Sequence, residues 1–168
     1  MKRTDFSVDW LFAVCAPDTE LPPQDTQFTP VDLPHDWQIR HADDLYRDGM
    51  LFYRKYFFVT AEPGTRRMLW FGGAYMDTTV FVNGTEVGQW KYGYTSFWFD
   101  ITDALHEGQN EVLVRCHLRH PNSRWYSGAG LFRQVELWKV PDFHLMPDGL
   151  YVAAKEVGNG AWNISVTA

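Results

Sequence analysis

Apolar and polar residues alternate with a period of two along most of this chain, and no long stripe with the 3.6-residue period of a helix occurs. Such alternation marks residues 53–59 and 110–118, and shorter apolar runs lie at residues 78–90, 95–102 and 131–140. In the second of these segments one face carries Val112, Val114, Cys116 and Leu118. Short strands separated by turn signals predict an all-β fold, an antiparallel β-sandwich.

The best local signal is the pair Asn83-Gly84, which stands between β-branched residues and a second short strand. Asn-Gly supplies the two positive φ angles of a type I′ hairpin turn. Asn83-Gly84-Thr85 also fits a glycosylation acceptor, but the turn explains these residues without secretion. Residues 100–110 have room for one helical turn between strands.

Prolines divide the chain into two parts. Five of them make residues 16–34 an ordered but irregular crossing over one end of the sandwich. Pro141 and Pro147 follow the last sandwich strand, and a new alternating run begins at Ala161. The sequence therefore predicts one sandwich domain over residues 1–140, followed by a linker and the first strands of another unit over residues 141–168.

Composition excludes several classes of function. A net charge of −6 argues against nucleic acid, which binds basic surfaces. No apolar run approaches the roughly 18 residues that span a bilayer, and the run Trp10–Ala16 is too short and too aromatic for a signal peptide, so it is interpreted as a strand. Two cysteines are too few for a disulfide scaffold, so we expect Cys15 and Cys116 to be buried thiols in the cytoplasm.

Metal and cofactor sites are not predicted. His117 and His120 are three residues apart, which on a strand places them on opposite faces, whereas a metal centre needs three or four convergent ligands. The remaining His–Asp groups are interpreted as surface or turn residues, namely His35-Asp36 and His41-Asp43-Asp44. Gly128-Ala129-Gly130 lacks the third glycine and the following helix of a dinucleotide fingerprint, so no cofactor is expected.

The sequence also predicts no catalytic residue. Hydrolysis of a glycoside requires two carboxyl groups facing each other across the bond, about 5–9.5 Å apart. The dipeptide Asn110-Glu111 is the nearest match to such a motif, but its context is a turn that runs into a strand. We therefore interpret Asn110 and Glu111 as structural residues.

The aromatic residues fall into two groups. Those that fit the strand pattern are expected in the core, namely Phe57, Phe58, Phe71, Phe81, Phe97 and Phe99. Those in or beside glycine-rich loops are Trp90, Tyr92, Tyr94, Trp125 and Tyr126. Exposed Trp and Tyr offer a flat apolar face with a polar edge, which suits the C–H face of a sugar and equally suits a protein neighbour.

Five motifs carry a resemblance to a known family. They are "VDLPHDWQI", "YRKYFFV", "FGGAYMDTTVFVNGTEVGQWKYGYTSFWFDIT", "GQNEVLVRC" and "SRWYSGAGLFRQVELW". Their order resembles that in family-2 glycoside hydrolases, which include β-galactosidases, β-glucuronidases and β-mannosidases, and the resemblance covers about Trp10 to Val140. It implies the N-terminal sugar-binding domain, a galactose-binding domain-like jelly roll, followed by the first strands of an immunoglobulin-like sandwich. The family's (β/α)8 barrel, which carries both catalytic glutamates, lies outside these residues.

The resemblance also implies site residues. In such enzymes the loop matching Asn122 to Arg133 leans toward the active site of the barrel, so the sugar-binding or pocket-shaping candidates are Asn122, Ser123, Arg124, Trp125 and Tyr126. Asp48 lies in another loop that approaches the pocket in relatives and is a further candidate. Arg124 is expected to pair with a carboxylate on the barrel, and Arg133 with one inside the domain. Some members have an aspartate where Ser123 stands, and a serine hydroxyl can bind a sugar hydroxyl without holding a cation.

These expectations together describe a non-catalytic domain that caps the barrel of a retaining β-glycosidase and is inactive alone. A β-linked terminal sugar is the expected ligand, with galactoside as the first choice and glucuronide as the second. Relatives often assemble, which leaves a homo-oligomer of the parent enzyme open. Two alternatives from other classes also stay open: an independent carbohydrate-binding module, and an assembly domain whose loops contact subunits.

Overall fold

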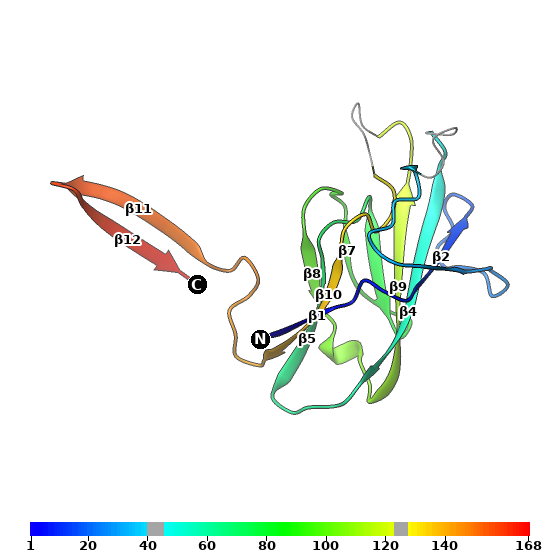
Figure 1. Ribbon diagram of the computed structural model, residues 1–168, viewed down its shortest axis with the longest axis horizontal. Coiled ribbons are helices and arrows are strands. Elements are labelled where there is room, and N and C mark those ends of the chain that lie inside the picture. The colour runs from blue at the N-terminus through cyan, green and yellow to red at the C-terminus, as the bar shows by residue number, and fades with distance from the viewer. Residues whose placement is uncertain (40–45, 123–127) are drawn as a thin grey trace.

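The computed structural model describes residues 1–39, 46–122 and 128–168, and two antiparallel sheets pack face to face in it (Figure 1). The strand orders are β1-β10-β5-β8 and β3-β2-β4-β9-β6-β7. The strands of the sandwich are β1 (Lys2–Asp5), β2 (Trp10–Cys15), β3 (Thr29–Val31), β4 (Gly49–Val59), β5 (Thr65–Phe71), β6 (Thr78–Val82), β7 (Thr85–Trp90), β8 (Phe97–Asp100), β9 (Gly108–Leu118) and β10 (Val135–Pro141). A 3₁₀ helix, η2 (Thr102–Ala104), supplies the expected helical turn. The prediction of an all-β sandwich is confirmed.

The core is built on β4 and β9, which pair over their whole length from Gly49↔Leu118 to Val59↔Gly108. Period-two alternation turns one face of each strand inward. The inward side chains of β9 are fully buried, and they are Val112, Val114, Cys116 and Leu118, as the sequence predicts. Leu51, Tyr53 and Phe57 of β4 face the same interior, where they meet Leu69 and Phe71 of β5. The interior therefore holds an aromatic and aliphatic core shared by both sheets.

One predicted core residue is wrong. Phe58 is 79% exposed, because Phe57 already points into the core and consecutive strand residues point to opposite faces. Phe81 is half-buried on the outer face of the six-stranded sheet, where it packs against Met50, Phe52 and Leu113. The other expected core phenylalanines, Phe57, Phe71, Phe97 and Phe99, do belong to the core or pack against it.

The proline-rich crossing is less irregular than expected. It contains β3, a short edge strand that pairs with β2 from Trp10↔Val31 to Phe12↔Thr29. Pro30 lies in the middle of β3, and only an edge strand accommodates a residue without an N–H in this way. Phe28, just before β3, covers the outer-face group around Phe52. The crossing is thus a cover for one face of the sheet.

The Asn83-Gly84 turn forms as predicted. Asn83 has a φ of 50° and Gly84 a φ of 79°, the positive pair that a type I′ turn requires. The turn joins β6 to β7, which pair from Val82↔Thr85 to Thr78↔Trp90.

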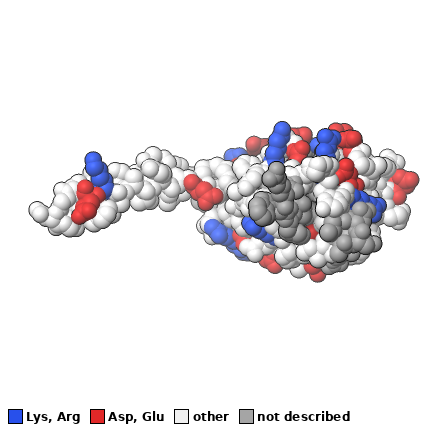
Figure 2. Space-filling model, turned by 90° about the horizontal axis from the view of Figure 1, so that it is seen from above, with Lys and Arg blue, Asp and Glu red and all other residues white. Residues whose placement is uncertain are grey.

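A hairpin of β11 (Tyr151–Gly158) and β12 (Ala161–Thr167) extends away from the sandwich and forms a sheet of its own (Figure 1). Its only charged residues are Lys155 and Glu156, and the rest of the hairpin is uncharged (Figure 2). Both faces are exposed, including the large side chains of Trp162 and Ile164. An isolated two-stranded hairpin is marginally stable in water, so contact with another surface would stabilise this one. Its assignment to an immunoglobulin-like domain, and the division after residue 140, stay predictions.

The two cysteines differ in burial. Cys116 is fully buried between the sheets, whereas Cys15 is half-exposed, so the expectation of two buried thiols holds for Cys116 alone. Burial raises the pKa of the Cys116 thiol to about 12.

We expect an alkylating reagent to label Cys15 in the folded chain and Cys116 only after unfolding. The thiolate is the reactive form, and Cys116 is both protonated at neutral pH and inaccessible. Mass spectrometry of peptides after iodoacetamide treatment, with and without urea, measures the difference. Equal labelling of both thiols in the folded chain would contradict the burial of Cys116.

Candidate functional site

The candidate site lies at the end of the sandwich where β4 begins and β9 ends (Figure 1). Asp48 and Asn122 flank these strand ends, and Figure 2 looks down on this loop end. Residues 35–39 and 128–131 reach the same end through backbone hydrogen bonds described below. We call this region the loop end and define it by residues 35–39, 46–48, 119–122 and 128–131.

The segment 129–131 is bonded on both sides. His35 N–H donates to the Leu131 carbonyl at 2.9 Å, and Trp37 N–H donates to the Ala129 carbonyl at 3.0 Å. On the other side Gly130 and Tyr75 exchange two backbone bonds of 2.7 and 2.9 Å. Residues 129–131 therefore lie between two other segments and are bonded to both. We call them the central rung.

Gly130 is required at this rung for two reasons. Its φ of +92° suits glycine, and a Cβ at this position would stand 2.0 Å from the hydroxyl oxygen of Tyr53. That hydroxyl lies 2.8 Å from Nδ1 of His35, and both side chains are buried. His35 is thus a core residue, and its interpretation as surface or turn chemistry is wrong.

Asp36 fixes the neighbouring turn. Its Oδ1 accepts from the N–H groups of Gln38 at 2.9 Å and of Ile39 at 3.3 Å, which is the local bonding expected of an aspartate in a turn. The same oxygen accepts from Ala129 N–H at 3.3 Å. Asp36 therefore ties residues 36–39 to the central rung.

Asp48 holds the end of β9. Its Oδ1 accepts from His120 N–H at 2.6 Å and lies 3.4 Å from Nδ1 of the His120 ring. The side chain of Asp48 remains 43% exposed, and its Oδ2 has no hydrogen bond to any residue that the structure describes. One oxygen of Asp48 thus positions the loop, and the other is available to a ligand.

The side-chain amide of Asn122 is buried at a cost in folding free energy. Both its amide oxygen and its amide nitrogen are buried, and neither has a hydrogen-bond partner in the described part of the chain. A buried polar atom without a partner costs about 1–3 kcal/mol. Such an amide calls for groups supplied from outside these residues. Ser123, Arg124, Trp125 and Tyr126, the other loop candidates, lie outside the described residues.

Among the described residues Arg133 has no carboxylate partner, contrary to expectation. Its Nη1 donates to the carbonyls of Gly72 at 3.1 Å and of Tyr94 at 3.2 Å, and its guanidinium carbon lies 5.1 Å from the Phe132 ring centroid. The side chain therefore bridges two backbone segments, residues 72–75 and 92–95.

Three aromatic residues on that second segment and beside it are exposed: Trp90 (38%), Tyr92 (58%) and Tyr94 (37%). Tyr94 meets Tyr75 edge-on with ring centroids 5.4 Å apart, and Tyr92 meets Tyr94 at 5.7 Å. Trp90 stacks on Phe97 at 5.8 Å. The sequence identifies these exposed rings but misses Tyr75, because its role depends on a backbone bridge to Gly130.

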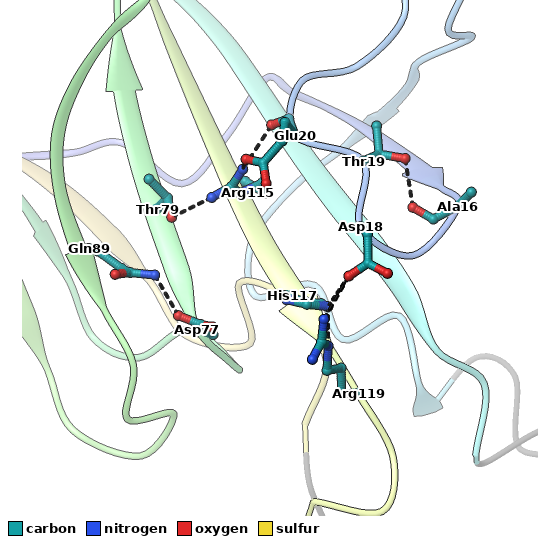
Figure 3. Close-up of polar contacts among 10 residues, drawn as sticks. All are labelled: Ala16, Asp18, Thr19, Glu20, Asp77, Thr79, Gln89, Arg115, His117 and Arg119. Carbon is teal, nitrogen blue, oxygen red and sulfur yellow. Dashed lines mark hydrogen bonds and ion pairs between the residues drawn. The ribbon is translucent and has the colours of Figure 1, made fainter.

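Charged residues brace β9 on its outer face (Figure 3). Arg115 pairs with Glu20 and donates to Thr79, while Arg119 donates to Asp18 at 2.6 Å and to Nε2 of His117 at 2.7 Å. His117 and His120 thus have separate partners. Within residues 1–39, 46–122 and 128–168, no group of three or more His, Cys, Asp or Glu residues is placed to hold a metal ion.

The dipeptide Asn110-Glu111 is structural. Asn110 is 1% exposed, and its amide bonds the backbone of His106 and Gly108. Glu111 lies 3.3 Å from Arg54.

No helix in the described residues has the length and apolar character to cross a membrane.

Replacement of Gly130 tests the rung. We expect Gly130→Ala to lower the free energy of unfolding by about 3 kcal/mol or more, because the methyl group must displace the Tyr53 hydroxyl and the backbone is strained. Gly84→Ala is the matched control: its φ is also positive, but nothing lies within 4 Å of the added Cβ, so about 1 kcal/mol is expected. Urea denaturation measures both, and equal losses would refute the proposed contact.

Comparisons with known proteins agree with this architecture. Residues 23–141 match the model of glycosyl hydrolases family 2, sugar binding domain. The β-galactosidase BoGH2A of Bacteroides ovatus is 36% identical over 93% of this chain and 20% of its own length. A β-glucuronidase of Bacteroides fragilis is 37% identical over 52% of this chain and 13% of its own.

A solved structure is also similar. It is a glycosyl hydrolase family 2 member from Bacteroides cellulosilyticus, with a TM-score of 0.77 and 30% identity over 92% of this chain and 23% of that one. The chain thus spans about a fifth of the length of the curated relatives that it matches over most of its length. The family-model match covers most of the sandwich and the whole loop end, and the chain therefore belongs to glycosyl hydrolases family 2, as a sugar-binding domain of that family.

Proposed function

We propose that this chain is the N-terminal, non-catalytic sugar-binding domain of a retaining β-glycosidase, and that its loop end helps to bind the terminal sugar. Two observations at the loop end carry the proposal: the buried amide of Asn122 has no partner among the described residues, and only one carboxylate oxygen of Asp48 accepts a hydrogen bond from them. An amide and a carboxylate are suitable hydrogen-bonding groups for sugar hydroxyls. Membership of the family supports a glycoside as the ligand.

Catalysis belongs to another part of the parent enzyme in this proposal. A retaining enzyme uses one carboxylate as nucleophile and another as acid and base, about 5–5.5 Å apart. At the loop end the described acidic groups are Asp36 and Asp48, and Asp36 is engaged by three backbone N–H groups. The chain therefore positions the sugar, and the parent's catalytic barrel cleaves it.

A β-galactoside is the first choice of substrate. The support is the similarity to the β-galactosidase of Bacteroides ovatus, which extends over 93% of this chain. A β-glucuronide is the second choice, favoured by the local similarity to the β-glucuronidase of Bacteroides fragilis. Both sugars offer hydroxyl groups to Asn122 and Asp48, although they differ in the configuration at C4 and in the group at C6.

The barrel is the proposed protein partner at this end. The exposed rings of Tyr92 and Tyr94 join the rung through Tyr75, so a neighbour packed on them would be held rigidly against the loop end. Assembly of the parent enzyme into a homo-oligomer through other surfaces is compatible with this arrangement.

A first experiment compares the 168-residue chain with the parent enzyme expressed from the full reading frame. We expect the chain alone to leave nitrophenyl β-galactoside intact and the parent to cleave it. Asn122→Ala in the parent should raise KM by about three- to tenfold, the value of one neutral hydrogen bond. Gln109→Ala, at the other end of β9, is the control and should leave KM unchanged. A reading frame without a barrel, or an unchanged KM in the Asn122 variant, would overturn the proposal.

Two replacements of Asp48 separate sugar contact from loop support. Asp48→Asn keeps an oxygen that accepts from His120 N–H but removes the charge, whereas Asp48→Ala removes both. If Oδ2 binds the sugar, Asp48→Asn should raise KM for the galactoside by about threefold or more at unchanged stability. If Asp48 only holds the loop, Asp48→Asn should match the unmodified enzyme, and only Asp48→Ala should lose stability and activity.

A further inference from the structure

A second concave surface lies where β5 ends and where β8 and β10 begin, and neither Asp48 nor Asn122 lines it. It is a cavity of about 470 Å³ lined by Pro34, Trp70, Ser96, Phe132, Arg133 and Gln134, with Gly72 at its floor. Pro34, Ser96, Arg133 and Gln134 are exposed, while Trp70 and Phe132 are half-buried. We call it the outer groove.

Among the described residues that line the outer groove, Arg133 is the only charged one. Its Nη1 is fixed by the carbonyls of Gly72 and Tyr94, so the guanidinium is held in one orientation before any ligand arrives. Nη2 and Nε have no hydrogen bond to the described residues. A preorganised guanidinium with two free donor nitrogens is suited to a carboxylate, which it can bind in a bidentate manner.

Trp70 supplies the apolar surface. Its ring stacks on Trp138 with centroids 5.8 Å apart and an interplanar angle of 14°, and Arg3 covers the opposite face of the pair at 4.4 Å from the Trp138 ring. This stack fixes the orientation of Trp70. One ring face of Trp70 lies outside the stack, and Trp70 lines the outer groove. A flat apolar face bordered by polar groups suits the C–H face of a pyranose ring.

Gly72 brings the two recognition groups together. A Cβ at Gly72 would lie 3.3 Å from Cη2 of Trp70 and 3.2 Å from Cβ of Arg133, so the two side chains approach each other over a backbone without a side chain. The apolar face and the charge are therefore within reach of one small ring. A depression of about 330 Å³ adjoins the outer groove and shares Pro34 and Gln134 with it. Its charged lining residues are Arg3, Asp5 and Glu136, so it suits an uncharged sugar better than a second uronate.

From this juxtaposition we propose that the outer groove binds a uronate residue of an acidic oligosaccharide. The ring of the uronate lies on Trp70, its carboxylate pairs with Arg133, and its hydroxyl groups meet Ser96 and Gln134. The adjoining depression receives the next sugar along the chain. The inference does not depend on the proposed function of the loop end, because that function rests on Asp48 and Asn122, and neither of them lines the outer groove.

The test uses two ligands that differ only in the carboxylate, methyl β-D-glucuronide and methyl β-D-glucoside, titrated into the ¹⁵N-labelled 168-residue chain at constant ionic strength. The indole N–H signal of Trp70 is assigned by its loss in Trp70→Phe. We expect the glucuronide to shift this indole signal and the amide signals of Ser96 and Gln134, with at least fivefold weaker binding of the glucoside. Sodium acetate is the control for a carboxylate without a sugar ring, and it should produce smaller shifts.

A charge placed in the outer groove provides the matched variants. Ser96→Asp should weaken glucuronide binding by about fivefold or more, because a second negative charge then faces the carboxylate at short range. Ser96→Asn is similar in size and uncharged, and it should bind as the unmodified chain does. Ser96 is exposed, so both variants are expected to fold.

Three results would overturn the inference: no shift at Trp70, equal shifts from glucuronide and glucoside, or shifts from acetate as large as those from glucuronide. Shifts confined to Asp48, His120 and Asn122 would do the same, because the sugar would then occupy the loop end. That last result would leave the proposed function intact, and the failure of the two proposals can therefore be distinguished.

Discussion

The loop end depends on the space that the missing side chain of Gly130 leaves for the hydroxyl group of Tyr53. Tyr53 belongs to the long core strand β4, and its hydroxyl reaches His35 at 2.8 Å. Gly130 sits over that hydroxyl and exchanges two backbone bonds with Tyr75. One core contact thus places the segments around residues 35, 75 and 130 together. Asp36 then extends the same order to residues 38 and 39. A rigid sandwich can present its binding loops only when such contacts define the loop bases.

The core strands could be predicted from the sequence because one face of each is buried. Where Val112, Val114, Cys116 and Leu118 alternate with more exposed residues, the period of two leaves one consistent register. Phe57 and Phe58 show the limit of this reasoning, since two adjacent apolar residues cannot both face one core. The face that each takes is decided by pairing with β9. The local Asn83-Gly84 turn needed no such information, because both positive φ angles are set by the residues themselves.

The candidate site was less predictable because its contacts join distant parts of the chain. Asp48 meets His120 only because β4 and β9 pair in a register that places Gly49 opposite Leu118. His35 looks like a polar turn residue in the sequence, and its burial depends on the packing of Tyr53 behind it. Arg133 finds two carbonyl groups where a carboxylate was expected. In each case the partner lies more than ten residues away, where neither period nor local propensity gives a signal.

The polar groups of the loop end lower the stability of the isolated chain, because some of them lack hydrogen-bond partners among the described residues. Most buried polar atoms in folded proteins have partners, and nearby Asp36 satisfies three backbone N–H groups with one oxygen. At the same end, neither amide atom of Asn122 has a partner among the described residues, and Asp48 uses one oxygen of two. Asp36 is therefore well used in hydrogen bonds, while Asn122 and Asp48 at the same end are not. The free-energy cost of unpaired polar atoms is concentrated at the loop end. Local violations of this kind are typical of functional sites, where a ligand or a second domain completes the bonding.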